Sequence, residues 1–226
     1  MRIPPTSNHF TIFKSDELQE LPQSFRRNFI NSLSGYKSLC LAGTVNRNHV
    51  FNLAVMSSVI HVGANPPFMG MLFRPNTVPR NTLENIVETS FFTLNHVTEE
   101  FYKAAHQTSA RYPEGESEFE KVGLEAEIGT VHPAPYVKAA PLQIGLAYQE
   151  VHRVQCNATI FLVGRIIEVR VLSDAVGEDG FIDLQKTGSL TVSGLDGYHR
   201  AMPISRLSYA KPDEELKEIP VDREEE

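Results

Sequence analysis

The chain has 226 residues and carries 21 Lys and Arg residues against 28 Asp and Glu residues, which gives a formal net charge of -7. This length suits one well-filled domain. The acidic balance argues against a nucleic acid or an acidic membrane as a partner, because either would need a broad basic surface. Any anion that the chain binds should therefore be small and held locally.

The termini and the cysteines indicate a reducing compartment. The first residues, MRIPPTSNHF, lack an apolar signal core, and no apolar stretch approaches the ~18 residues that span a bilayer. Cys40 and Cys156 each lie in an apolar run without a CxxC pair, and we interpret both as buried free thiols. We therefore expect a cytoplasmic protein.

The first element in chain order is a helix in the stretch SFRRNFINSLS, residues 24–34. Its apolar residues Phe25, Phe29, Ile30 and Leu33 have helical spacing. This spacing predicts a short amphipathic helix that packs on a sheet and contributes to the core.

Short runs rich in apolar, β-branched or aromatic residues follow, separated by Asn, Gly and Pro turns such as VNRN and GANPP. They predict strands at 39–45, 51–57, 68–73, 91–97, 142–154 and 159–171. Helices are predicted at 81–89, at 98–108 with Thr98 as cap, and at 117–122 with a capping box of Ser117 and Glu120. The pattern indicates a mainly β fold, an antiparallel barrel with flanking helices, in one domain over 1–210, with an acidic tail over 211–226.

Two arginines precede the helix predicted at 81–89, in the stretch RPNTVPRNTLENI. A helix start already attracts anions, so Arg80 next to a cap at Asn81 or Thr82 suits a bound phosphate. The alternative is that Arg80 is a solvated loop residue and that Arg74 pairs with a surface carboxylate.

The strand in FNLAVMSS ends in Ser57 and Ser58 and runs into the loop VIHVGANPP. Small and hydroxyl-bearing residues at a strand end let a ligand approach the backbone and offer hydrogen-bond donors. The alternative interpretation of the serine pair is ordinary turn chemistry.

Together these pieces resemble the flavin reductase-like family of FMN-binding split barrels, which includes flavoredoxins. The resemblance rests on the order of GTVNRNHVFNLAVMSS, the Asn-Pro-Pro loop, FMGMLF, RNTLENI, FFTLNHV, FLVGRIIEVRV and GLDGYH, and covers roughly residues 36–200. It implies a Greek-key-like antiparallel split barrel that binds FMN. The region before Tyr36 and the segment 102–141 match less well, and we assign both to access or to a dimer contact.

The resemblance also implies the cofactor-binding residues. The FMN phosphate would be held by Arg80, Asn81 and Thr82, with Asn81 in place of the commoner aspartate. The strand-end residues carried over from the family are Asn52, Ala54, Met56, Ser57 and Ser58. Tyr198 would cover the flavin ring or the nicotinamide, unless it is a core or dimer-interface tyrosine.

We expect neither a catalytic side chain nor a metal, because flavin chemistry resides in the cofactor and no HExxH, GxSxG, P-loop or Rossmann motif is present. His61 and His199 could contact the flavin. The remaining histidines considered are interpreted as turn or surface residues: His49, His106, His132 and His152.

By resemblance, the protein is a homodimeric FMN-binding oxidoreductase that transfers hydride from NAD(P)H to flavin and electrons onward to an unknown acceptor. Three alternatives stay open. The first is an electron-carrying flavin protein that serves a redox partner protein. The second is an oxidase like the pyridoxamine-phosphate oxidases, against which the sequence RNTLENI speaks. The third is a flavin-free structural domain.

Overall fold

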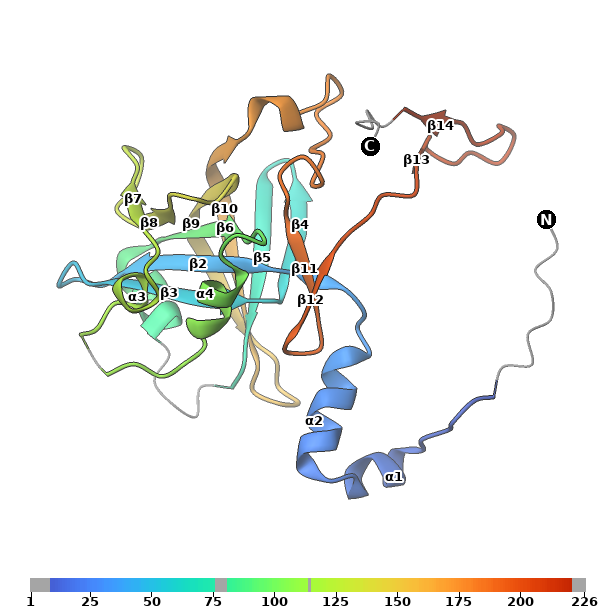
Figure 1. The fold of residues 1–226 in the computed structure, drawn as a ribbon, viewed down its shortest axis with the longest axis horizontal. Helices are drawn as coiled ribbons and strands as arrows, with labels where there is room; N and C mark the ends of the chain where they lie inside the picture. The colour runs from blue at the N-terminus through green and yellow to red at the C-terminus, as the bar shows by residue number, and fades with distance from the viewer. Residues whose placement is uncertain (1–8, 76–80, 114, 221–226) are drawn as a thin grey trace.

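The computed structural model describes residues 9–75, 81–113 and 115–220. Its centre is a seven-stranded antiparallel sheet in the order β3-β2-β6-β9-β10-β5-β4 (Figure 1). The strands are β2 (Cys40–Val45), β3 (Phe51–Met56), β4 (Val59–Ala64), β5 (Pro67–Phe73), β6 (Phe91–His96), β9 (Leu142–Arg153) and β10 (Ile160–Val171).

The connection between β3 and β4 makes this sheet a split barrel. The two strands form opposite edges of the sheet, yet only Ser57 and Ser58 separate them in sequence. The sheet must therefore curl until its edges meet at this junction. The predicted antiparallel barrel with flanking helices is confirmed, and the six predicted strands match within one residue at each end. The expected loop after Ser58 is instead β4, because its apolar residues pair with β5.

Two hydrophobic cores lie on opposite faces of the curled sheet. The first joins β2, β4, β5, β6, β9 and β10 to α3 (Asn81–Thr89), the predicted helix. The second joins β2 and β3 to α4 (Tyr102–Gln107), α5 (Glu118–Val122) and a small sheet of β1 (Lys37–Ser38), β11 (Leu190–Ser193) and β12 (Gly197–Arg200). The helices therefore cover separate faces of the same sheet.

Two predicted caps are wrong. The residue that caps α4 is Phe101 rather than Thr98, since the helix begins later than expected. Ser117 occupies the cap position of α5 but its side chain makes no capping hydrogen bond. The hydroxyls of Thr98 and Ser117 are both buried without a partner in the described structure.

A buried polar cluster fixes the hairpin of β7 (Ala126–Ile128) and β8 (Pro135–Val137) onto β9 and β10. The Tyr136 hydroxyl lies 2.9 Å from His132 Nε2 and donates to Glu168 at 2.8 Å. Arg170 Nε donates to the same carboxylate at 2.9 Å. His132 was expected in a turn or at the surface. It lies in the connection between β7 and β8, but its ring is buried beside Gly145 of β9, and burial lowers its pKa.

The two cysteines differ in solvent exposure. Cys40 is buried in the first core, as expected. Cys156 is exposed, because its apolar run bends into the turn between β9 and β10, where Val154 N donates to Thr159 O at 2.8 Å. The prediction of a second buried thiol is wrong.

Two arms extend from the body (Figure 1). The N-terminal arm contains α1 (Ser15–Glu20) and α2 (Gln23–Ser32), and the C-terminal arm contains β13 (Arg206–Leu207) paired with β14 (Glu218–Ile219). The helix predicted over 24–34 exists as α2, but it contains no buried residue. Its expected packing on the sheet is wrong: the Phe29 ring instead stacks with Phe25 and contacts Phe13 in a tilted arrangement, both within the same arm.

Candidate functional site

The candidate site begins on one face of β3. In the β2–β3 register, Asn52 lies opposite Thr44, Ala54 opposite Ala42, and Met56 opposite Cys40. Because side chains alternate along a strand, Asn52, Ala54 and Met56 point to the same side of the sheet. This is the side covered by α3. The fold therefore places three of the predicted residues in one row beside the helix.

Two buried hydrogen bonds tie α3 to this face. Asn52 Nδ2 donates to Thr82 Oγ1 at 3.0 Å, and Asn85 Nδ2 donates to Thr44 Oγ1 at 3.1 Å. All four side chains are buried, so each pair satisfies groups that would be costly to leave unpaired. The first pair joins two residues that the sequence had assigned to the same ligand. Thr82 accepts in this bond, which leaves its hydroxyl proton to be donated.

The start of α3 offers further donors. The first backbone N–H groups of a helix have no partner within the helix, and the dipole makes this end partially positive. Asn81, the first residue of α3, has an exposed side chain. Arg80 lies outside the described residues, so its predicted role is not addressed by the structure. The donors described here are neutral hydroxyl, amide and peptide groups.

Arg74 follows the end of β5 and has an exposed side chain. It lies near enough to Lys37 to affect it: burial, and secondarily the Arg74 charge, lower the pKa of the Lys37 amine. Lys37 Nζ donates to the Gly194 carbonyl at 2.6 Å. Arg74 therefore belongs to a cationic region near β1.

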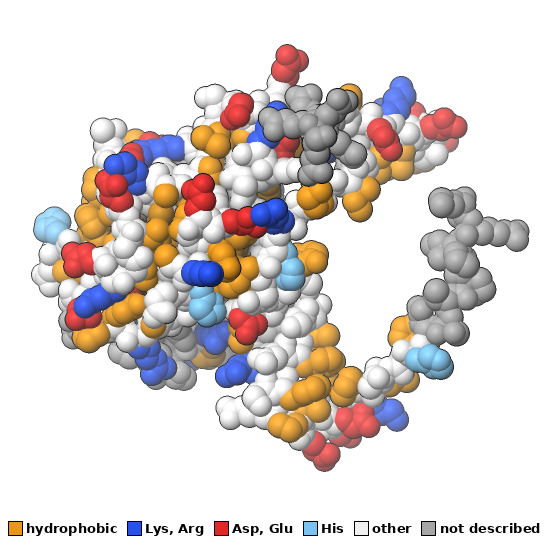
Figure 2. All heavy atoms as spheres, in the orientation of Figure 1, with side chains coloured by type: hydrophobic (Ala, Val, Ile, Leu, Met, Phe, Trp, Pro, Cys, Tyr) orange, Lys and Arg blue, Asp and Glu red, His pale blue; other side chains and the backbone are white. Residues whose placement is uncertain are grey.

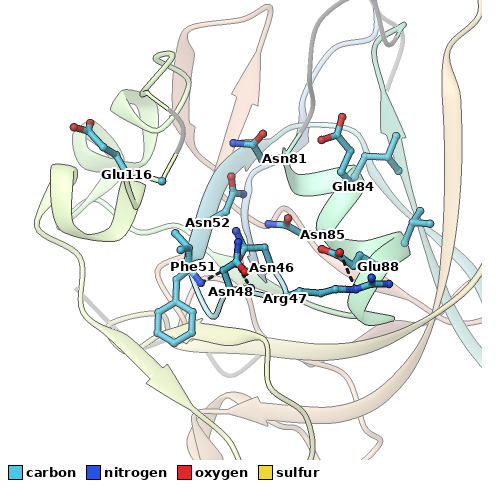
Figure 3. Close-up of a pocket in the computed structure, with 14 residues that line it drawn as sticks. Asn46, Arg47, Asn48, Phe51, Asn52, Asn81, Glu84, Asn85, Glu88 and Glu116 are labelled. Carbon is cyan, nitrogen blue, oxygen red and sulfur yellow. Dashed lines mark hydrogen bonds and ion pairs between the residues drawn. The ribbon is translucent and has the colours of Figure 1, made fainter.

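An open cleft of about 890 Å³ lies beside α3 (Figure 3). It runs between the β2–β3 turn, the exposed face of α3 and residues 115–116. Predicted residues that line it are Asn52 and Asn81. Three carboxylates also line it, those of Glu84, Glu88 and Glu116, and Glu88 pairs with Arg47 at 2.8 Å. The cleft is thus lined by amides and carboxylates, and one of these carboxylates, Glu84, belongs to the first turn of α3.

Ser57 and Ser58 are half-buried at the junction of β3 and β4, outside the lining of this cleft. The Ser58 carbonyl accepts from Leu72 N at 3.0 Å. Nearby, the Ser38 hydroxyl accepts from Val59 N at 3.1 Å and donates to Val59 O at 3.0 Å. These hydrogen bonds stabilise the junction where the two edges of the barrel meet. This junction lies at the opposite end of β3 from Asn52.

Tyr198 lies apart from the cleft. It is in β12, packs against the second core, and its hydroxyl is 2.6 Å from His106 Nδ1. Its neighbour His199 bonds Ser193 through Nε2 at 2.8 Å. His61 is exposed on β4. The structure thus gathers the strand and helix residues but places Tyr198 on the other face of the sheet.

Two residues near β3 were missed by the sequence analysis. Glu118 Oε2 accepts from Leu53 N, and Thr108 Oγ1 accepts from Val55 N, both at 2.9 Å. They cover the free edge of β3. Burial raises the pKa of the Glu118 carboxyl, although the bond from Leu53 opposes this shift. No local sequence signal marks such contacts, because they depend on where α4 and α5 dock.

The donor set suits a phosphate-bearing ligand, since hydroxyl, amide and helix-start groups all donate to anions. The side chains give no sign of a metal centre: among the described residues, no group of three or more His, Cys, Asp or Glu could hold an ion. None of the helices that the structure describes is long and apolar enough to cross a membrane.

Comparisons with known proteins identify the family and the fold of the chain. Residues 37–190, more than half of the chain, match the model of the flavin reductase like domain. The chain belongs to this family. It is 46% identical to a Shewanella frigidimarina protein assigned as a flavin reductase with a split barrel domain, with a TM-score of 0.86 over 89% of this chain and 100% of that one.

A more distant solved structure supports the fold of this flavin reductase-like chain. Flavoredoxin of Desulfovibrio vulgaris is 23% identical, with a TM-score of 0.64 over 79% of this chain and 92% of that one. An uncharacterised Aquifex aeolicus protein is 29% identical over 99 residues, 43% of this chain. That alignment spans half (50%) of the Aquifex protein's length. The family, a flavin-related redox function and the split barrel are therefore established.

Proposed function

We propose that this chain is an FMN-dependent NAD(P)H oxidoreductase that works as a homodimer and passes electrons to a further acceptor. The proposal combines membership of the flavin reductase-like family with one observation, the Asn52–Thr82 hydrogen bond that joins the β3 row to the start of α3. Bound FMN would supply the acceptor of the hydride. The protein's own residues then have to bind and orient it.

In this proposal the phosphate lies at the start of α3. Thr82 donates its hydroxyl proton, Asn81 its side-chain amide, and the first backbone N–H groups of α3 complete the set. Arg80 would add a positive charge. Glu84, which is in the first turn of α3, and Glu116 line the adjoining cleft, so the donors at the helix start and the Arg80 charge have to outweigh the repulsion between these carboxylates and the phosphate.

The rest of the cofactor would follow the β3 row toward Ser57 and Ser58. Asn52 and Ser57 are five positions apart along an extended strand, a distance of roughly 16 Å. This length accommodates an elongated ligand with a phosphate at one end. The small side chain of Ala54 leaves room beside the strand, while Met56 offers an apolar contact and the serines offer donors to a polar ring edge.

In this proposal only the ring of Tyr198 contacts the ligand, because its hydroxyl is hydrogen-bonded to His106. Its packing in the second core matches the alternative interpretation of a core tyrosine. Two variants distinguish a ligand-contacting ring from a core tyrosine. If the ring contacts flavin, Tyr198→Phe should bind FMN like the wild type and Tyr198→Ala should bind it more weakly. If it contacts the nicotinamide, Tyr198→Ala should instead raise the KM for the pyridine nucleotide.

The test uses the purified protein incubated with FMN and freed of unbound ligand. Its flavin absorbance bands are recorded before and after anaerobic addition of NADH or NADPH. Bands that bleach with either nucleotide support the oxidoreductase and identify the donor. Bands that persist would replace it with an electron carrier reduced by a partner protein. Absence of retained or titratable FMN would contradict both.

A further inference from the structure

The two arms carry the most exposed apolar side chains of the described chain. Seven large hydrophobic residues are 64–88% exposed, and all seven lie in the arms, whereas the other exposed ones reach at most 56%. These seven are Phe10, Ile12, Leu33, Tyr36, Met202, Ile204 and Tyr209. Single exposed apolar side chains are normal on a protein surface, but a group of them marks an interaction surface.

The arms share one origin. The N-terminal arm ends at Tyr36, directly before β1, and the C-terminal arm starts at Ala201, directly after β12. Both strands belong to the same three-stranded sheet, and the Tyr36 ring lies 4.8 Å from that of His199. Both arms leave the same side of the body with an open space between them (Figure 1). Figure 2 shows hydrophobic side chains gathered along the helical arm.

Neither arm has the means to be stable alone. The helices α1 and α2 have 6 and 10 residues, below the ~12–15 residues at which isolated helices become marginal in water. The strands β13 and β14 have 2 residues each, and an isolated two-stranded hairpin is marginal at best. The arms therefore need a surface to pack on.

The exposed area has the size of a dimer interface. With the less exposed Phe25, Ile30, Leu207 and Leu216, eleven large apolar side chains of the arms are exposed. At roughly 150 Å² for each fully exposed large side chain, they present on the order of 1,000 Å². One partner of a standard interface contributes about 800 Å², so the two arms together expose enough apolar area for such an interface.

The body offers a matching apolar surface next to the arm origin. On the outer face of β4 and β5, Ile60, Val62 and Leu72 are 48%, 44% and 37% exposed. The Phe161 ring of β10 lies over Gly70 of β5 beside Val62. Since β4 adjoins β1 through the Ser38 bonds, this surface is continuous with the base of the arms.

We propose that the two arms clasp a second copy of this chain, with α2 as the central contact. A symmetric dimer uses the same surface of each subunit twice, so each copy supplies both arms and one receiving surface. The inference rests on the proposed homodimer and adds the segments that hold it together. It does not depend on the flavin chemistry.

The test compares two triple variants by sedimentation velocity over a concentration series. Phe25→Ser, Ile30→Ser and Leu33→Ser alter the arm, while Ile128→Ser, Val131→Ser and Val169→Ser alter similarly exposed residues of the body. The arm variant should dissociate at least about 100-fold more readily than wild type. The body variant should remain dimeric. Far-UV circular dichroism verifies the fold of both.

A second measurement reports on the arm itself. The chain has no tryptophan, so Leu33→Trp introduces a single fluorophore into the arm, with Val131→Trp as the control in the body. Emission of the arm probe should shift to the red when the dimer is diluted to monomer, and that of the control should not.

Three results would overturn the clasp. They are a monomeric wild type at all concentrations, an arm variant as dimeric as wild type, and an arm probe insensitive to dilution. FMN binding is measured on the same samples. An arm variant that stays dimeric and binds FMN refutes the clasp but leaves the proposed function, whereas a dimer that binds no FMN refutes the function alone.

Discussion

The pairing of Thr82 with Asn52 gives the sharpest prediction about the site. Thr82→Val keeps the shape of the side chain but removes its oxygen, so the Asn52 amide, buried and bonded at 3.0 Å in the wild type, loses its acceptor. An unsatisfied buried donor costs about 1–3 kcal/mol. For a chain of this size, that cost lowers the Tm by roughly 2–12 °C.

The same substitution should weaken FMN binding separately. A hydrogen bond to a charged phosphate contributes about 1.5–3 kcal/mol. Its loss raises the Kd of FMN by roughly 10–150-fold. Fluorescence titration of FMN measures the affinity, and thermal unfolding without ligand measures the stability.

Thr44→Val is the matched control. Thr44 accepts from Asn85 at 3.1 Å on the same face and is fully buried, so it cannot touch a ligand. Both variants should lose similar stability, but Thr44→Val should keep its FMN affinity. If the two variants bind FMN equally well, Thr82 has a structural role only, and the assignment of the phosphate to the start of α3 is refuted.

Further outcomes follow from the described packing. Burial raises the pKa of Glu118, so the folded state holds this proton more tightly than the unfolded state, and stability is lost as pH rises through the folded pKa. The Tm of Glu118→Gln relative to wild type should therefore increase from acidic to neutral pH, and a constant difference would contradict the shift. Gly145→Ala places a methyl group against the buried His–Tyr pair of the polar cluster and should cost about 1–3 kcal/mol in urea unfolding. Gly63→Ala, which has space for the methyl, should cost less, and equal losses would argue against the clash. Burial raises the pKa of Cys40 to about 12, so a thiol reagent should label Cys156 alone in the native protein and both thiols after unfolding, whereas rapid native labelling of both would show that the first core opens.

The barrel strands could be predicted because their apolar runs are bounded by turn residues, and α3 could be predicted because its apolar residues have helical spacing. β4 was missed since Gly63 and the Asn-Pro sequence resemble a loop, while its strand character depends on pairing with β5. The apolar spacing of α2 predicted a helix correctly. It could not show that the helix would extend away from its own sheet, because periodicity identifies an apolar face and not the surface that covers it.

The sequence could name candidate residues for the site but not their arrangement in space. Asn52 and Thr82 stand thirty positions apart, and only the docking of α3 on β3 brings them into contact. The acidic lining from Glu116 and the edge contact of Glu118 come from a segment with no local signal. Tyr198 looked suitable as an aromatic residue in a glycine-flanked loop, but pairing of β11 with β12 directs it to α4.

The central claim, that the flavin is held through its phosphate at the start of α3, is tested most directly by titrating the wild-type protein with FMN and with riboflavin under the same conditions. The two ligands share the ring and differ in the phosphate. The structure predicts that FMN binds at least about 10-fold more tightly, because the helix start and Thr82 act on the phosphate alone. Equal affinities would show that the phosphate makes no net contribution and would contradict the proposed site.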